Sequence, residues 1–485
     1  MGWNFDQMVQ LFSSDDKAYL LNQGYFGIER EAQRITPKGD LALTPHPVVF
    51  GDKEDNKRIT TDFSESQIEM ITPTFDSVEE VYNSLKEIYA EVEKGISNEL
   101  LWPLSMPPKL PNEELIPIAI FRQTKEGCEK TVYRNGLAYR YGKKMQMISG
   151  IHYNFSFNER MIQAIFERFG SKKNYIYFKN EIYLAIIRNF LRYRWLLIYL
   201  FGASPNFDAT FSSVIEQQLK IVEKCCPEST ALLYNFNQNA TSLRVSRFGY
   251  SDINGGRINI YFNSLDEYIT KLKKMLNTKS KKYSKADEHM SDKAVQLNTN
   301  ILQKESEFYS SIRLKQNPAP GETQLSALEH KGVKYLEVRL LDINPYEKLG
   351  ITLQQMHFLQ VFMLYCLFER SPKIAQYEFE RINSNHHMTA LFGRMENLML
   401  YGDDHKILPL QEFGRSIFRK LQVIADLMDK AGQDGKYSKS VADEYFKLED
   451  LSLLPSERMQ REMWETNNDF ITYGLKLINK NSIKF

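Results

Sequence analysis

Residues 147–158, MISGIHYNFSFN, alternate between apolar and polar side chains, and this alternation constrains the fold more than any other segment. Successive side chains of a strand point to opposite faces, so the pattern predicts a strand with one apolar and one polar face. The apolar face carries Ile151, Tyr153, Phe155 and Phe157; the polar face carries His152, Asn154, Ser156 and Asn158. The segment therefore predicts a sheet with one face against helices and the other open to a ligand.

Three further segments read as strands. In KYLEVRLLDINP (334–345), Glu337 and Arg339 share one face, and the segment ends at Asn344-Pro345. Asp342 has the parity of the apolar face and is interpreted as a turn cap. YFGIEREAQRI (25–35) is the third strand, and a fourth is expected within RITTDFSESQIEMITP (58–73).

The remaining segments are mostly helical. Residues 76–96 carry a helical apolar repeat that begins at an Asp or Ser N-cap. The apolar stretch 183–205 contains three arginines, which favours a buried core helix over a membrane crossing. Residues 159–235 and those from 351 onward also read as helical, the latter without a further site signal. Strands dispersed among helices predict an α+β fold, with residues 1–485 as a single domain whose core motifs span 25–345 and whose helical part spans 351–485.

The charge and cysteine content exclude several classes of function. With 62 basic and 61 acidic residues the net charge is +1, which gives no reason to expect nucleic acid or an anionic membrane as a partner. The four cysteines (Cys128, Cys225, Cys226 and Cys366) match no zinc spacing, and they are interpreted as buried or idle thiols. The N-terminus has no signal-peptide pattern, so a cytoplasmic location is expected.

Acidic residues recur on the predicted strands, but each group has an ordinary explanation when taken alone. Glu29 and Glu31 lie two apart on one strand face, where a solvated surface explains them equally well. In RITTDFSESQIEMITP (58–73), Glu65 and Glu69 share a face, whereas Asp62 joins them only if the chain bends after it or forms helical turns. Glu337 beside Arg339 is most simply an ion pair.

Taken together, these groups predict a metal and phosphate site on a sheet. Mg²⁺ prefers hard oxygen ligands and is commonly held by a few carboxylates together with substrate phosphates. His152 lies on the polar strand face, and arginines such as Arg134 and Arg339 would neutralise charge on a transferred phosphoryl group. The sequence contains no GxxxxGK[ST] loop and no kinase motif set, so an ATP site would be of another design.

At these residues the chain closely resembles the bacterial glutamate–cysteine ligase (gamma-glutamylcysteine synthetase) family, in its stand-alone form. Nine stretches follow one another in the family's order over roughly residues 25–345. They are GIEREAQRI, ITTDFSESQIEMITP, LWPLSMPP, YRNGLAYRYG, QMISGIHYNFS, FGASP, TSLRVSRFGY, ESEFYSSIR and YLEVRLLDINP. The resemblance implies a curved antiparallel sheet, similar to that of glutamine synthetase, which forms a funnel for the substrates.

The resemblance also implies roles for individual residues. The metal ligands implied are Glu29, Glu31, Asp62, Glu69, His152 and Glu337. Arg134 and Arg339 match the residues that face the transferred phosphate, and the cysteine pocket implied consists of Phe63, Arg244, Tyr250 and Tyr309. Glu65 receives no direct role, and no adenine-contacting residue is identified. Residues 251–258 and 279–297 match the family's pattern less well.

The activity implied is the ATP- and Mg²⁺-dependent joining of glutamate to cysteine, the first step of glutathione synthesis, with Mn²⁺ as a substitute metal. Glutamate, cysteine and ATP are the expected partners of a monomer. Three alternatives remain open: a related ligase with another amine acceptor, a two-metal hydrolase, and an amino-acid-binding protein without catalysis. Release of ADP that depends on both amino acids distinguishes the first hypothesis from the others.

Overall fold

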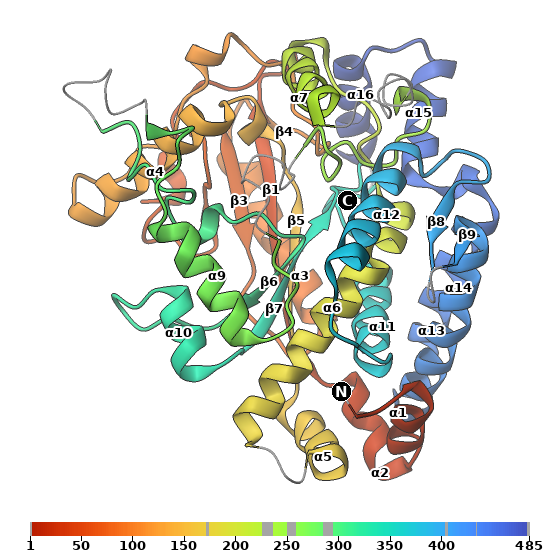
Figure 1. The fold of residues 1–485 in the computed structure, drawn as a ribbon. Helices are drawn as coiled ribbons and strands as arrows, with labels where there is room; N and C mark the ends of the chain where they lie inside the picture. Colours follow the sequence, from red (N-terminus) through yellow and green to blue (C-terminus); the bar gives the residue numbers. More distant parts are fainter. Residues whose placement is uncertain are drawn as a thin grey trace.

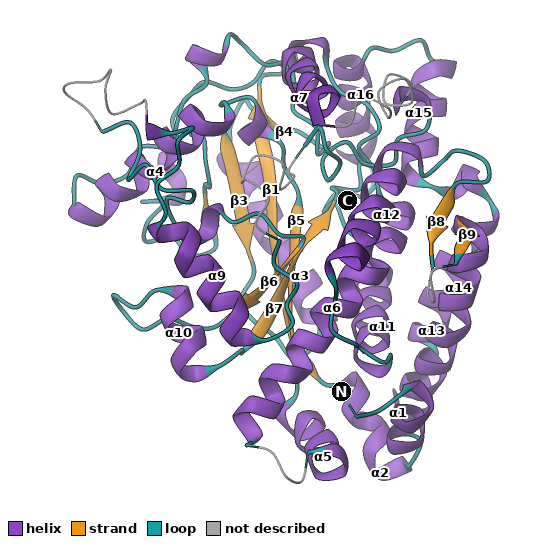
Figure 2. Ribbon diagram, in the orientation of Figure 1, coloured by secondary structure: helices purple, strands orange, loops and turns teal. Residues whose placement is uncertain are grey.

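The protein is built around a seven-stranded antiparallel sheet, seen here in a computed structural model (Figures 1 and 2). The structure describes residues 2–170, 174–225, 236–249, 259–284, 294–402, 406–432 and 434–482. The strand order is β2-β3-β1-β5-β7-β6, with β4 paired to β1, and β8 and β9 form a separate hairpin. The strands are β1 (Gly24–Ile35), β2 (Ile59–Thr60), β3 (Gln67–Ile71), β4 (Leu100–Leu101), β5 (Ile151–Phe157), β6 (Ile312–Lys315), β7 (Tyr335–Leu341), β8 (Met399–Tyr401) and β9 (Ile407–Pro409).

The register of the sheet brings acidic residues from different strands side by side. Glu29 on β1 pairs with His152 on β5, and Glu31 pairs with Glu69 on β3. Between β5 and β7 the register shifts by one residue, because Ile151 pairs with Leu341 whereas Tyr153 pairs with Val338. This β-bulge places two residues of β7 opposite one residue of β5, an arrangement that redirects side chains.

Helices surround the sheet. They are α1 (Phe5–Phe12), α2 (Asp15–Ala18), α3 (Val78–Gly95), α4 (Lys125–Tyr141), α5 (Glu159–Phe169), α6 (Tyr175–Phe201), α7 (Ser212–Cys225), α9 (Leu265–Asn277), α10 (Gln324–Lys331), α11 (Leu353–Phe368), α12 (Gln376–Phe392), α13 (Leu410–Gly432), α14 (Lys436–Glu449), α15 (Pro455–Glu465) and α16 (Phe470–Ser482). The long helices α6, α11, α13 and α14 pack beside one another on one side of the sheet (Figure 1). Within the described residues, no helix is both long and apolar enough to cross a membrane.

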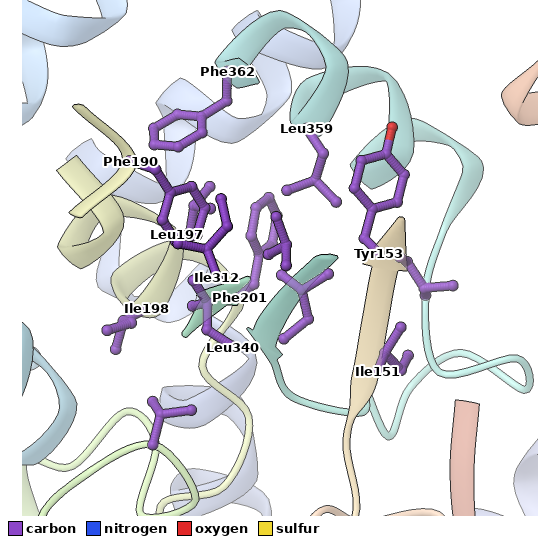
Figure 3. Packing of buried hydrophobic residues seen from close by; sticks show 14 of the residues in the cluster. Ile151, Tyr153, Phe190, Leu197, Ile198, Phe201, Ile312, Leu340, Leu359 and Phe362 are labelled. Atoms are coloured by element: carbon purple, nitrogen blue, oxygen red, sulfur yellow. The ribbon is translucent and has the colours of Figure 1, made fainter. Parts of the chain in front are cut away.

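The core lies between the apolar sheet face and helices α6 and α11. Figure 3 shows Tyr153 of β5 beside Leu359 of α11 and Phe190 of α6 beside Phe362 of α11, with Phe201 of α6 in the middle of the view. All of these side chains are buried. The apolar half of the alternation at 151–157 is thus buried in the core, which leaves the polar half on the opposite face.

Most of the elements expected from the sequence are present, and the α+β class is confirmed. The helix expected over 76–96 is α3, with Ser77 as its N-cap, and the arginine-containing apolar stretch lies in the buried helix α6. The strand expected over 58–73 is instead two strands, β2 and β3, joined by a turn that contains Asp62. The short strands β4, β6, β8 and β9 were not predicted from the sequence.

Candidate functional site

A cavity of about 780 Å³ lies on the polar face of the sheet, a volume typical of ligand sites. Residues of helices α4, α6, α9 and α12 and of the stretch 302–311 also line it. All six predicted metal ligands line it: Glu29, Glu31, Asp62, Glu69, His152 and Glu337. The structure therefore brings residues from four separate stretches of the chain to one place.

Glu29, His152 and Glu337 form the tightest cluster in this cavity. One potential ligand atom from each lies within 4.8 Å of the others. The Nδ1 atom of His152 is 3.0 Å from a Glu29 oxygen and 3.7 Å from a Glu337 oxygen. Burial opposes ionisation of Glu337, but Arg339 and Lys315 hold its pKa well below the ordinary value. Burial also opposes ionisation of Glu29, but its hydrogen bond with His152 lowers the pKa of that carboxyl group. Both carboxylates are therefore available to a cation.

Glu31, Asp62 and Glu69 form a second acidic group beside the first, and it has less positive charge near it. Burial, followed by the charges of Glu29, Asp62 and Glu31, raises the pKa of Glu69 well above its ordinary value. Burial likewise raises the pKa of Glu31. Among the described residues, Glu69 makes no ion pair or side-chain hydrogen bond. Carboxylates held together in this way repel one another unless a proton or a cation intervenes.

The bend after Asp62, which the sequence interpretation required, is present. Asp62 lies in the turn between β2 and β3, and its carboxylate is 3.7 Å from Arg134. Arg134 comes from α4, donates from Nε to the Asp62 carbonyl, and stacks 4.2 Å from the ring centroid of Phe121. Two separate contacts thus fix this guanidinium at the edge of the acidic group.

Arg339 faces the cavity from β7. Its Nη1 atom donates to Glu337 at 2.7 Å and is 3.4 Å from His152 Nδ1, so the predicted Glu337–Arg339 pairing on one strand face is present. On the neighbouring strand β6, Lys315 is 3.2 Å from Glu337, and Arg313 lies directly opposite Glu337 in the register. These three cations surround the first acidic cluster.

The four residues expected around a cysteine pocket have different locations. Arg244 and Tyr309 line the cavity. Phe63 is only 2% exposed and packs in the hydrophobic core, outside the residues that line the cavity. Tyr250 and the stretch 251–258 lie outside the described residues.

Glu65 does not share a face with Glu69, which corrects the expectation from simple alternation. The turn before β3 directs Glu65 away from the cavity, where it forms an ion pair with Lys53 and accepts hydrogen bonds from the backbone N–H groups of His46 and Ile120, each at 2.7 Å. These three donors lower its pKa, although burial acts in the opposite direction. Glu65 thus ties two loops to the turn that carries Asp62.

The sequence interpretation also missed cavity residues. Arg313 and Lys315 lie on β6, whose sequence IRLK alternates in the same way as β5 and could have been recognised. After residue 351, where the sequence shows no further site signal, α12 contributes Asn383, His386 and His387 to the cavity wall. Those residues follow no motif, and only the folding of the chain reveals them.

The residues present fit divalent cations. Glu29, His152 and Glu337 supply two carboxylate groups and an imidazole nitrogen. Glu31, Asp62 and Glu69 supply further carboxylate oxygens, and in the part of the chain that the structure describes Glu69 has no ion-pair partner. Mg²⁺ favours carboxylate and phosphate oxygens, and repelling carboxylates of this kind are stabilised when a cation binds.

Comparisons with known proteins relate the chain to one family over most of its length. Residues 9–389 match the model of the glutamate–cysteine ligase family. The curated glutamate–cysteine ligase of Clostridium acetobutylicum is 56% identical over 478 residues, covering 98% of this chain and 99% of the relative. The glutamate–cysteine ligase of Pseudomonas putida strain KT2440 is 40% identical, covering 94% of this chain and 85% of the relative.

Solved structures agree with the sequence comparisons. A crystal structure of the glutamate–cysteine ligase of Francisella tularensis in complex with AMP has a TM-score of 0.84 and 31% identity, and covers 95% of this chain and 89% of that one. The bifunctional glutathione synthetase of Pasteurella multocida has a TM-score of 0.75 and 29% identity, and the match covers 96% of this chain and 53% of that one.

Proposed function

The chain belongs to the glutamate–cysteine ligase family, and from that premise we propose that it uses ATP to join the γ-carboxylate of L-glutamate to the amino group of L-cysteine. The observation that carries this proposal is the position of Glu69, which lies against Glu31 and Asp62 and has no ion-pair partner among the residues that the structure describes. Such a cluster suits a reaction in which bound cations accompany a polyphosphate substrate. The AMP in the Francisella tularensis structure supports a nucleotide as that substrate.

In the proposed reaction, an oxygen of the glutamate γ-carboxylate attacks the γ-phosphorus of ATP, and ADP leaves. The resulting γ-glutamyl phosphate is attacked at its acyl carbon by the cysteine amine, which loses a proton as inorganic phosphate departs. A carboxylate and an amine react slowly with each other, and the acyl phosphate intermediate replaces this one step of high activation energy with two steps of lower activation energy. This order of steps requires that water be kept from the acyl phosphate until the amine arrives.

The chain's own groups suit these steps. Arg134 and Arg339 face the same cavity and would stabilise charge on the transferred phosphoryl group. Both are fixed before substrate arrives, Arg134 by Asp62 and the Phe121 ring and Arg339 by Glu337, so little reorganisation is needed. Arg244 and Tyr309 line the same cavity and would bind the acceptor amino acid.

We further propose Mg²⁺ as the resident cation, with Mn²⁺ as a substitute. Glu29, His152 and Glu337 would hold one ion, and Glu31, Asp62 and Glu69 another. When bound, the cations supply neutralisation of phosphate charge and alignment of the reacting groups. A monomeric state and a cytoplasmic location remain predictions, which gel filtration and cell fractionation would test.

The proposal is tested by ADP release from the wild-type protein with Mg²⁺, glutamate and cysteine, beside Glu337→Gln. We expect release that requires both amino acids, and a loss of at least two orders of magnitude in kcat for Glu337→Gln. Glu80→Gln is the matched control, because Glu80 is exposed on α3 and does not line the cavity. ADP release without glutamate, or an unimpaired Glu337→Gln variant, would refute the assignment.

A second candidate is a related γ-glutamyl ligase with another amine acceptor. The cavity is lined in part by α12, whose contributions follow no motif that the sequence identified. ADP release with a panel of amino acids in place of cysteine separates the two candidates. A strong preference for an amine without a thiol would favour the second.

A further inference from the structure

The segment 117–121 runs beside the turn between β2 and β3, and the side chain of Glu65 extends the contact between them. The Glu65 N–H donates to the Pro117 carbonyl at 3.1 Å, and the backbone pairing continues as far as Ala119. The next N–H, that of Ile120, donates to the carboxylate of Glu65 at 2.7 Å. The carboxylate therefore fixes the backbone one residue beyond the pairing of the two main chains.

Three donors share the carboxylate of Glu65, and together they use both of its oxygens. Oε1 accepts from the Ile120 N–H and from the ammonium group of Lys53. Oε2 accepts from the His46 N–H at 2.7 Å. Glu65 is 7% exposed, and buried donors that lose their acceptor cost free energy. A glutamine here would keep one acceptor oxygen and turn an N–H group toward one of these donors, so the position suits a carboxylate.

Phe121, the residue after Ile120, is the surface on which the guanidinium of Arg134 stacks. The ring is 6% exposed, and its centroid lies 4.2 Å from Cζ of Arg134. The Phe121 N–H donates to the hydroxyl of Thr131 at 3.3 Å, and Thr131 and Arg134 both belong to α4. The backbone that Glu65 fixes therefore leads directly into the contact with Arg134.

The orientation of the Arg134 guanidinium depends on this ring. Its Nε atom donates to the Asp62 carbonyl, and its Nη1 atom donates to the Lys130 carbonyl at 2.9 Å. These two hydrogen bonds hold the edge of the guanidinium, whereas the ring of Phe121 packs against its face. A displaced ring would let the group tilt about the two bonds and would move Nη2, which lies 3.7 Å from the Asp62 carboxylate.

We propose that Glu65 is a positioning residue for phosphoryl transfer, because it holds the backbone before Phe121 and thereby keeps the ring against the guanidinium of Arg134. The inference rests on the proposed function, since it presupposes a phosphoryl group in the cavity. Glu65 does not line the cavity. Its effect reaches the reaction through Arg134 alone, which predicts a loss of kcat that disappears once Arg134 has been replaced.

The test is a double-mutant cycle in the ADP-release assay. Glu65→Ala removes both acceptor oxygens, and Phe121→Leu removes the ring but keeps an apolar side chain. Each change is made in the wild type and in Arg134→Lys. In the wild type we expect each to lower kcat about tenfold, with the KM values for glutamate and cysteine within about twofold, because a misplaced guanidinium stabilises the transition state less well. In Arg134→Lys each should lower kcat by less than about twofold, because the group that they position is already absent.

Glu79→Ala is the matched control, since Glu79 is another carboxylate that joins separate segments. It is hydrogen-bonded to His357 of α11 and accepts from Lys436 of α14, each at 2.9 Å, and it does not line the cavity. Glu79→Ala should lower the melting temperature, as Glu65→Ala should, but kcat should stay within about twofold of its parent in both backgrounds. Assays well below the lowest melting temperature of the set separate loss of folded protein from loss of positioning.

The outcomes separate the inference from the function on which it rests. An equal loss of kcat from Glu65→Ala in both backgrounds would show that Glu65 acts independently of Arg134, and it overturns the inference. An unchanged kcat in the wild-type background overturns it as well. In both cases the wild type releases ADP with glutamate and cysteine, so the ligase assignment stands.

A second variant keeps the inference testable if Glu65→Ala does not fold. Glu65→Gln retains one acceptor oxygen, and it should cause a smaller loss of kcat that also disappears in Arg134→Lys. Together with Phe121→Leu it then decides, and losses that persist in Arg134→Lys overturn the inference. A wild type that releases no ADP under any condition overturns the proposed function, and the role of Glu65 in phosphoryl transfer with it.

Discussion

Replacing Glu69 by glutamine should have opposite effects on stability with and without a divalent cation. Glu69 and Glu31 are direct partners on neighbouring strands, and no cation among the described residues pairs with Glu69. In the absence of metal, Glu69→Gln removes one of several repelling carboxylates and should stabilise the fold. In the presence of metal it removes a ligand and should destabilise the complex.

The register of the sheet gives the magnitude. Directly opposite residues of an antiparallel pair have Cβ atoms about 5 Å apart. Two unit charges at that distance repel by roughly 3 kcal/mol at an effective dielectric constant of about 20. Because burial and the neighbouring carboxylates raise the pKa of Glu69, part of this repulsion is relieved by the proton, and a stabilisation of about 1–2 kcal/mol is expected without metal. A cation at 100 times its Kd adds about 2.7 kcal/mol to the wild type, and the variant should lose most of this gain.

Thermal unfolding in EDTA and in excess Mg²⁺ measures both effects. We expect the variant to melt a few degrees above the wild type in EDTA and below it in Mg²⁺. Glu65→Gln is the control, because Glu65 lies on the same segment but is paired with Lys53 and two backbone N–H groups. It should lower the melting temperature in both conditions. A Glu69→Gln variant less stable than the wild type in EDTA would refute the reasoning.

Three other predictions concern separate parts of the molecule. Burial lowers the pKa of His46 to about 4, and neither of its ring nitrogens has a hydrogen-bond partner among the described residues. The imidazole of His46 binds a proton near pH 6.5 in the unfolded chain but only near pH 4 in the folded chain, so the stability of the fold should decrease as the pH drops from 6.5 to 4. His46→Asn should reduce the change of melting temperature with pH over this range. An unchanged dependence of melting temperature on pH in the variant would contradict the prediction. Phe155→Ala should lower the free energy of unfolding by about 3–5 kcal/mol in urea titrations, because the ring of Phe155 is buried in the core. A loss below about 1 kcal/mol would contradict this prediction and show that neighbouring side chains move to fill the cavity. Arg134→Lys should lower kcat by about 10²-fold or more in the ADP-release assay, because an ammonium group cannot reproduce both the contact with Asp62 and the stacking on Phe121. A kcat equal to that of the wild type would show that a positive charge alone is sufficient at this position.

The parts of the fold that were predictable follow from local periodicity. The alternation at 151–157 and the N-cap at Ser77 each depend on a few neighbouring residues, and the structure contains both elements as expected. The same holds for Glu337 and Arg339, which share a face because they lie two apart on a strand. Strand alternation and N-cap preferences predict a side chain's direction correctly where that direction depends only on the helix or strand that carries the residue.

The parts that were not predictable depend on distant contacts. The turn that separates Asp62 and Glu65 from β3 is fixed by bonds from Glu65 to Lys53 and to loops around residues 46 and 120, none of which adjoins it in sequence. The wall formed by α12 arises because that helix packs on α6, far from any motif. Strict alternation predicts that Asp342 lies on the apolar face of the strand, where it was interpreted as a turn cap. The bulge in β7 shifts the alternation by one residue, and Asp342 lies instead beside Arg244.

The bulge in β7 has a consequence for which sequence changes this protein can tolerate. Because two residues of β7 lie opposite one residue of β5, both Leu340 and Leu341 are buried, and Asp342 still reaches Arg244. Deleting one residue between Glu337 and Asp342 would restore regular pairing but turn the following side chain to the wrong face. The spacing of five residues from Glu337 to Asp342 is therefore fixed by the bulge. Insertions and deletions in functional homologues should therefore be absent from this interval.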